Sequence, residues 1–151
     1  MNTNLTPSQD RPAVDLALLV VRVVAGVIMA AHGAQKLFGV FGGYGLSATV
    51  EQMGPLGYPV TIGEFFGGLG LIVGFLTRFS AAANVVIMLG AIALAHGKNG
   101  FFLSAGGFEY NLALIGLLVP TLIAGPGKWS IGRFLPLPKA KPSDRPILAL
   151  E

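Results

Sequence analysis

The chain contains no cysteine among its 151 residues. This absence excludes disulfides, thiolate metal sites and dithiol redox chemistry together, so any electron that the protein handles needs a bound cofactor. Charged residues are also scarce, at 11% of the chain, against roughly 25% in an average soluble domain. The mean hydropathy is +0.71, and the apolar residues are gathered into long blocks. These features indicate an integral membrane protein.

Motifs of soluble enzymes and of nucleic-acid-binding proteins are missing as well. No nucleophile triad, phosphate loop or nucleotide fingerprint is present, because the run Gly67-Gly68-x-Gly70 lies inside an apolar block and not at a strand-to-helix turn. The basic residues, which give a pI of about 9.5, are few and fall mostly after the last apolar block. The lipid bilayer is therefore the expected partner, and no nucleic acid is. These absences argue against catalysis by this chain alone.

The apolar blocks predict an all-α integral membrane protein with a four-helix bundle. The spans are expected at about residues 15–38, 61–76, 79–96 and 109–124, within a membrane domain of residues 14–135. A polar lead at residues 1–13 and a proline-rich cytoplasmic tail at residues 136–151 flank this domain. In the first outer loop Leu46, Val50 and Met53 recur at helical spacing, which indicates a short helix at the membrane surface.

Two short motifs recur at a fixed distance along the chain. Ala31-His32-Gly33 returns as Ala95-His96-Gly97, and Gly42-Gly43-Tyr44 returns as Gly106-Gly107-Phe108, both 64 residues further on. Such self-similarity is typical of internal duplication, so the bundle is expected to consist of two pseudo-repeated helical hairpins. Chance matching in a glycine- and alanine-rich sequence is the alternative.

The lysine and arginine residues predict the orientation in the membrane. The side with both termini and the turn at residues 77–78 carries most of them, and the opposite side carries Lys36 and Lys98. By the positive-inside rule, both termini then lie in the cytoplasm. The residues on the cytoplasmic side are Arg11, Arg78, Lys128, Arg133, Lys139, Lys141 and Arg145.

This topology brings the polar residues of the spans to the outer end of the bundle. The first and third helices end there and the second and fourth begin there, as in an up-down-up-down bundle. Imidazole, carboxylate and ammonium groups thus share one level, where opposite charges pair. The candidate ligand-binding residues are His32, Gln35, Lys36, Glu64, His96, Asn99, Glu109 and Asn111.

The same residues belong to longer motifs, which keep their order along the chain. They are His32-Gly33-x-x-Lys36-Leu37-Phe38-Gly39, Glu64-Phe65-x-Gly67-Gly68-Leu69 followed by Gly74-Phe75-x-Thr77-Arg78, His96-x-x-x-Gly100-Phe101-Phe102, and Gly107-x-Glu109-Tyr110-Asn111-Leu112. Over about residues 16–134 the sequence resembles the DoxX family of small bacterial membrane proteins. The resemblance implies a four-helix protein of the bacterial inner membrane, with relatives linked to quinone oxidoreduction and to resistance against oxidative stress.

We interpret the outer residues as a site for a quinone. His32 and His96, which the pseudo-repeat relates, are expected to face each other across the bundle axis and to bond the two carbonyl oxygens of the ring. Glu64 or Glu109 then exchanges protons with it. The protein is accordingly expected to be a quinone-linked or redox-associated subunit that works with a membrane or soluble oxidoreductase. Histidines that only cap their helices, by bonding a carbonyl or a glutamate, are the alternative.

Other interpretations of the chain stay open. His32, Glu64, His96 and Glu109 also form a ligand set for zinc, iron or manganese. Neither glutamate, however, has the Glu-x-x-His spacing of carboxylate bundles. In place of a redox role, the protein is a non-catalytic scaffold or assembly partner of a membrane complex, or a small-solute transporter. Its glycine-rich helix faces favour a homo-oligomer.

Two further polar residues lie in the cytoplasmic half of the spans. Arg22 and Asn84 are at similar depths in the first and third helices. We expect both to be structural, because ionisable groups within spans are costly unless they are paired or reach the interface. Either the two side chains bond each other and lock the helices together, or Arg22 extends to the membrane surface.

Overall fold

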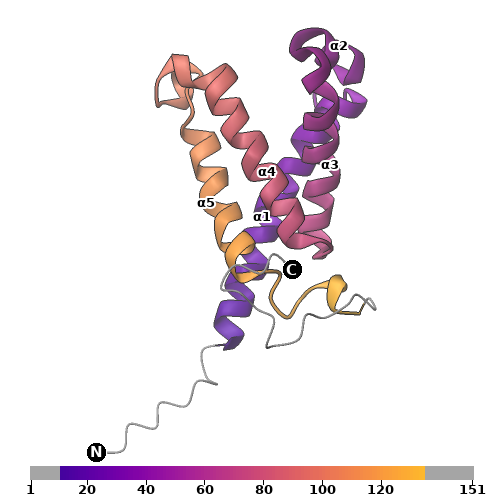
Figure 1. The fold of residues 1–151 in the computed structure, drawn as a ribbon, viewed down its shortest axis with the longest axis vertical. Coiled ribbons are helices and arrows are strands. Elements are labelled where there is room, and N and C mark those ends of the chain that lie inside the picture. Colours follow the sequence, from indigo (N-terminus) through magenta and orange to yellow (C-terminus); the bar gives the residue numbers. More distant parts are fainter. Residues whose placement is uncertain (1–10, 135–151) are drawn as a thin grey trace, which may run out of the picture.

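The computed structural model describes residues 11–134, so the predicted tail at residues 136–151 and most of the predicted polar lead lie outside the described residues. The described chain is helical and contains no strand. Four helices form a bundle and a fifth, α2, is short, which confirms the predicted all-α membrane bundle (Figure 1). The helices are α1 (Arg11–Phe38), α2 (Gly45–Met53), α3 (Gly57–Val73), α4 (Thr77–Ala91) and α5 (Glu109–Ala124).

Three helical stretches are long and apolar enough to cross a membrane. They are Pro12–Phe38, Gly45–Val73 and Thr77–Asn99. Helix α5 is shorter, with 16 residues, which corresponds to about 24 Å at 1.5 Å per residue. Pro120 lies inside α5 without ending it. The chain is thus a membrane protein with three long apolar helical stretches and one shorter helix.

Two helices begin earlier than predicted, in each case around a proline. Helix α1 begins at Arg11, inside the predicted polar lead, with Pro12 in its first turn. Helix α3 begins at Gly57 and not near residue 61, with Pro59 in its first turn. Proline is tolerated there because the first N–H groups of a helix have no partner within the helix. Beyond α4 the chain continues through a π-helical turn, Ile92–His96.

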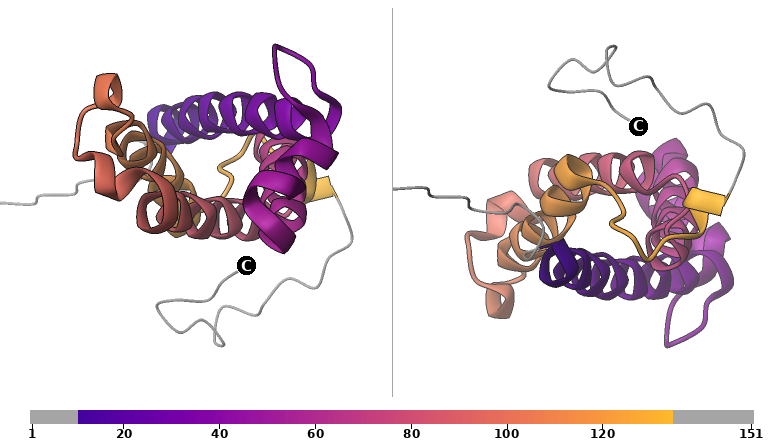
Figure 2. Two further views of the ribbon diagram at one scale, coloured as in Figure 1. Left: turned by 90° about the horizontal axis from the view of Figure 1, so that it is seen from above. Right: turned by 90° about the horizontal axis from the view of Figure 1, so that it is seen from below.

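Helices α1, α3, α4 and α5 are arranged as a ring. Helix α1 contacts α3 and α5, and α4 contacts the same two helices, as the end-on views in Figure 2 show. We call one end of the ring the terminal end, because it carries the start of α1, the α3–α4 turn and the end of α5. The other end, the loop end, carries the connections from α1 to α3 and from α4 to α5 (Figure 1).

Small residues bring the α1 and α3 backbones into contact. A Cβ atom added to Gly68 would lie 2.4 Å from the Ala30 nitrogen, and one added to Gly33 would lie 2.3 Å from the Phe65 nitrogen. In lipid such close approach is what holds helices together. These glycine faces therefore pack against helices of the same chain. Two buried apolar clusters fill the ring, one of Ala25, Leu71, Ala81 and Leu118 and one of Met29, Met88 and Leu114.

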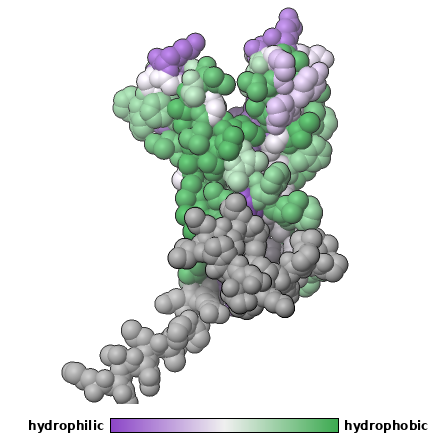
Figure 3. All heavy atoms as spheres, viewed as in Figure 1, coloured by the Kyte–Doolittle hydropathy of each residue, from purple (hydrophilic) through white to green (hydrophobic). Residues whose placement is uncertain are grey.

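The loop end divides into two arms. The first arm consists of the end of α1, the loop at residues 39–44, α2 and the start of α3. The second arm consists of residues 92–108 and the start of α5. Figure 3 shows a notch between the arms, with hydrophilic residues at both tips and apolar residues below them. Helix α2 is the short surface helix that the sequence predicted in the first outer loop.

The two arms share part of their backbone conformation at the repeated motif. Gly42 and Gly106 have φ angles of +76° and +75°, a region that L side chains rarely adopt. Tyr44 and Phe108 then precede α2 and α5 with φ angles of −96° and −97°. The repeated motif is therefore only partly repeated in the structure, because Phe41 before the first copy has a φ of +52°, whereas a 3-10 turn, Leu103–Ala105, precedes the second.

After this turn the two arms differ. Helix α5 continues without a break, whereas α2 ends at Met53. Gly54, with a φ of +62°, and Pro55 follow Met53, and the chain resumes as α3. At the repeat spacing, Glu109 aligns with Gly45 at the start of α2 and not with Glu64. The helix break thus gives the first arm an additional helix.

Candidate functional site

All eight predicted ligand-binding residues lie toward the loop end, but the structure brings them together in separate groups (Figure 1). Gln35, Lys36 and Glu64 belong to the first arm. His96, Asn99 and Glu109 belong to the second arm. His32 and Asn111 lie on α1 and α5. The expected pairing of opposite charges is found for Lys36 and Glu64, whereas the other predicted residues lie in separate groups.

A buried ion pair joins α1 and α3 in the first arm. Lys36 Nζ donates a hydrogen bond to Glu64 Oε2. Glu64 is 3% exposed, whereas the side chain of Lys36 keeps 28% of its exposure. A buried carboxylate remains charged only when a partner compensates the loss of water. Lys36 is therefore the partner that compensates for the burial of the Glu64 side chain.

Helix α2 and the preceding loop are held over this ion pair. Thr49 Oγ1 lies 2.8 Å from Gly45 O on its own helix and 3.3 Å from Lys36 O. Gln35 Nε2 donates to the carbonyl oxygen of Phe41 over 3.0 Å. Phe41 has a φ of +52°, which is unusual for a residue other than glycine. Side chains of α1 and α2 thus fix the path of the chain above Lys36.

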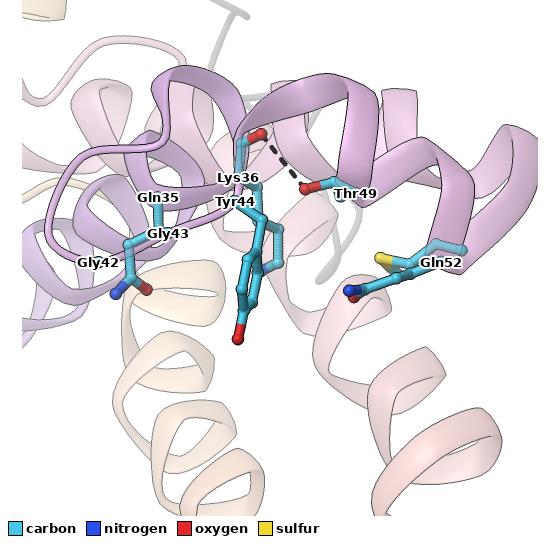
Figure 4. Close-up of a pocket in the computed structure, with 8 residues that line it drawn as sticks. Gln35, Lys36, Gly42, Gly43, Tyr44, Thr49 and Gln52 are labelled. Carbon is cyan, nitrogen blue, oxygen red and sulfur yellow. Dashed lines mark hydrogen bonds between the residues drawn. The ribbon is translucent and has the colours of Figure 1, made fainter.

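A cavity of about 240 Å³ opens at the loop end, lined by Lys36 of the ion pair and not by Glu64 (Figure 4). Lys36 lines it from α1, and α2 provides another wall. In Figure 4 the ring of Tyr44 extends between the side-chain amides of Gln35 and Gln52. The cavity therefore combines hydrogen-bonding groups with one flat aromatic surface. Its lining residues are Gln35, Lys36, Gly42, Gly43, Tyr44, Thr49, Gln52 and Met53.

Sequence reasoning found the α1 part of this cavity and missed the α2 part. Gln35 and Lys36 were among the predicted site residues, whereas Thr49, Gln52 and Met53 were not. A signal for them was present, because a surface helix was predicted in this loop. A helix that covers the end of a bundle turns one face toward the bundle, and that face forms a wall of any cavity beneath it.

The polar side chains of the second arm bond to the backbone of their own arm. His96 Nδ1 lies 2.9 Å from the carbonyl oxygen of Gly106, and Asn99 Nδ2 donates to the same oxygen over 3.2 Å. Glu109 Oε1 accepts a hydrogen bond from the Leu103 nitrogen, 2.8 Å away. These contacts hold the loop closed. His96 therefore follows the capping alternative.

The two histidines have different partners. The His32 ring packs edge to face against Tyr110 at a centroid distance of 6.1 Å, while His96 bonds Gly106. Asn111 Nδ2 donates to Met88 Sδ over 3.5 Å, which is a weak hydrogen bond. Within residues 11–134 no three His, Asp or Glu side chains lie where they could hold a metal ion. His32, Glu64, His96 and Glu109 therefore do not form one metal centre.

Arg22 and Asn84 do not form the predicted pair. Arg22 is 1% exposed, so it does not extend to the membrane surface either. Its guanidinium donates to backbone carbonyl oxygens, those of Leu71 and Ile72 in α3 and of Trp129 beyond α5. Asn84 Nδ2 donates to Ser80 O over 2.8 Å within its own helix. The partners of both residues are main-chain atoms.

Comparison with known proteins gives a family match and two relatives. The model of the DoxX family matches residues 17–97. The inner membrane protein YqjF of Escherichia coli (strain K12) is 32% identical over 124 residues, which cover 80% of this chain and 93% of that protein. An uncharacterized membrane protein, Rv3486, of Mycobacterium tuberculosis (strain ATCC 25618 / H37Rv) is 25% identical over 142 residues, with 79% and 81% covered. No solved structure matches the chain significantly.

Proposed function

This chain belongs to the DoxX family of membrane proteins, and from that premise we propose that it binds a quinone-type ring in its first arm. In this role the protein is a redox-associated subunit of the membrane. The observation that carries the proposal is that Lys36, which is paired with the buried Glu64, lines a cavity at the loop end. An acid and a base that meet next to a cavity are the groups through which a protein binds and protonates a small polar ring.

The size of the cavity limits what it holds. Sites for drug-sized ligands have roughly 300–1,000 Å³, and this cavity has about 240 Å³. It therefore takes a single ring, while an apolar tail stays outside in the lipid. This restriction agrees with a ligand whose polar head lies at the membrane interface.

The lining also agrees with a quinone in its chemistry. The Lys36 ammonium and the Gln52 amide are hydrogen-bond donors for carbonyl oxygens, and the Tyr44 ring provides a flat surface for stacking. A quinone supplies reversible chemistry of two electrons and two protons when it is bound. Lys36 holds a proton on Nζ, and Glu64 accepts one on Oε2, so the ion pair is the proton-exchanging part of the site.

We further propose the orientation and the partner of the protein. The loop end lies on the outer side of the bacterial inner membrane and both termini lie in the cytoplasm. The excess of lysine and arginine on the terminal side supports this orientation, and the Escherichia coli relative is named an inner membrane protein. A membrane or soluble oxidoreductase, bound as a partner, supplies or accepts the electrons.

Quinone binding to the purified protein in lipid nanodiscs tests the proposal. The double variant Lys36→Met/Glu64→Gln removes both charges, so that neither is left buried without a partner. We expect its Kd for a short-tailed quinone to rise at least about tenfold, which corresponds to about 1.4 kcal/mol at 25 °C. Isothermal titration gives the Kd, and circular dichroism checks that the variant is folded.

The second arm provides a matched control. The variant Lys98→Met/Glu109→Gln makes the same two chemical changes in the other arm, and we expect its Kd to equal that of the unchanged protein. Equal weakening in both double variants contradicts a site in the first arm. A folded, unchanged protein that binds no quinone contradicts the proposal as a whole and favours a non-catalytic assembly role.

A further inference from the structure

The terminal end of the ring is crossed by the segment that follows α5. We call residues 125–134 the strap. Seen from below in Figure 2, it passes across the ring from the end of α5 toward the α3–α4 turn. The loop end has no such connection between its two arms (Figure 1). Within the described residues, the strap is therefore a connection across the ring that the terminal end has and the loop end does not.

Polar contacts attach the strap to α1 and to the α3–α4 turn. The Lys128 nitrogen donates to Asp15 Oδ1 over 3.0 Å, and Lys128 Nζ lies 3.6 Å from Asp15 Oδ2. The Gly132 nitrogen donates to Gly74 O over 3.1 Å. Arg22 Nη2 donates to the Trp129 carbonyl oxygen. The strap is thus held at three points along its length.

Burial of apolar side chains of the strap against the helices contributes little to this closure. Ser130 is buried, but the side chains of Trp129 and Ile131 are 65% and 53% exposed. The polar contacts given above are hydrogen bonds and an ion pair, which water can replace. Segments with few buried apolar contacts are the ones that open locally while the rest of a protein stays folded.

Arg22 connects the strap to the interior of the bundle. Its Nη1 donates to Leu71 O over 2.7 Å and to Ile72 O over 3.0 Å. Its Nε has no partner, and in the described part of the chain no carboxylate pairs with the guanidinium. Removing a charged group from water is costly when its coordination is incomplete. An open strap would return water to the guanidinium, so the gain from closure is offset by desolvation.

We propose that the strap is a lid that opens and closes over the terminal end, and that Arg22 is the positioning residue that latches it. In the closed state Arg22 binds the Trp129 carbonyl. In the open state water takes the place of that carbonyl. Gly125 and Gly127, with φ angles of +83° and +69°, give the start of the strap its freedom to turn. Opening also admits water to buried hydroxyls near this end, because Thr77 Oγ1 and Thr121 Oγ1 have no hydrogen-bond partner.

Cysteine labelling tests this lid, because the chain has no cysteine of its own. A water-soluble maleimide is added to the single-cysteine variants Ser130→Cys and Trp129→Cys in nanodiscs. We expect Ser130→Cys, at a buried position, to react slowly and Trp129→Cys, at an exposed position, to react fast. Adding Arg22→Gln should accelerate the labelling of Ser130→Cys at least about tenfold. Arg22→Lys keeps the charge without the planar donors, so its rate should fall in between.

Two controls make the result decisive. Lys98→Gln at the loop end should leave the labelling rate of Ser130→Cys unchanged. If circular dichroism shows that Arg22→Gln is unfolded, Asp15→Asn is used in its place. We expect it to accelerate the labelling of Ser130→Cys about threefold, because it removes a partly exposed ion pair. If Ser130→Cys alone reacts as fast as Trp129→Cys, the strap is not closed, and the proposal is contradicted. A slow rate that no variant of Arg22 or Asp15 alters shows that these residues do not latch it.

Discussion

The two arms share a glycine motif and differ in what their polar side chains bind. In the second arm His96, Asn99 and Glu109 bond the backbone of their own loop. In the first arm Lys36 and Glu64 bond each other between two helices, beside a cavity. Side chains that complete a loop are unavailable to a ligand, whereas an ion pair at the edge of a cavity is available. A shared motif thus gives the arms a common fold without a common role.

The cause of the difference is the break in the helix of the first arm. Gly54 and Pro55 end α2 after Met53, and α2 then lies over the end of α1. Helix α5 has no such break and continues from the second copy of the motif as one helix. The break provides the wall of the cavity that contains Thr49 and Gln52. The first arm therefore owes its site to two residues that lie outside the site.

The largest expected effect concerns the turn that the arms share. A Cβ atom on Gly43 would lie 2.3 Å from Gln35 O, and one on Gly107 would lie 2.2 Å from Gly100 O. We expect Gly43→Ala and Gly107→Ala each to lower the free energy of unfolding by about 3 kcal/mol, because the obstructing atoms belong to the backbone. Unfolding in detergent micelles, followed by circular dichroism, measures the change.

The matched control for these variants is Gly90→Ala. A Cβ atom at Gly90, in α4, would meet nothing within 4 Å, so this variant should stay within about 1 kcal/mol of the unchanged protein. If only one of the two turn variants is destabilised, the turns are not equivalent, and the structural repeat is contradicted.

A smaller effect is expected from the charges in which the arms differ. Lys36→Met leaves Glu64 buried without a partner. We expect a loss of about 2 kcal/mol, below the roughly 3–5 kcal/mol of a fully buried pair, because the Lys36 side chain keeps 28% exposure. Lys98→Met, at an exposed lysine of the second arm, should change stability by less than about 0.5 kcal/mol. Thermal unfolding of both variants in one detergent measures the difference, and equal losses contradict the contrast between the arms.

The positions of the helices could be predicted from the sequence for a physical reason. A chain in lipid must satisfy its backbone hydrogen bonds internally, so long apolar blocks become helices. The starts at Arg11 and Gly57 differ from the predicted ones, and each helix has a proline, Pro12 or Pro59, in its first turn. Proline acts as a breaker inside a helix and as a starter in its first turn.

The pairing of opposite charges could be predicted from the sequence, and Lys36 and Glu64 form such a pair, whereas the partners of the two histidines could not. The antiparallel order of the helices alone places His32, Glu64 and His96 toward one end. The partners of the two histidines depend on how each helix is rotated about its axis and on the path of each loop, and the spacing of the motifs gives neither. The partner of Arg22 was also out of reach, because Trp129 is 107 residues away along the chain.

Photo-crosslinking with a quinone that carries a photoreactive group tests the assignment of the site most directly. The unchanged protein is irradiated in nanodiscs, with and without an excess of unmodified quinone, and the modified peptides are identified by mass spectrometry. We predict adducts within residues 35–53 of the first arm that the excess of quinone suppresses. Adducts within residues 96–111 of the second arm, or equal adducts on both arms, would contradict a ligand site built by the Lys36–Glu64 ion pair and α2.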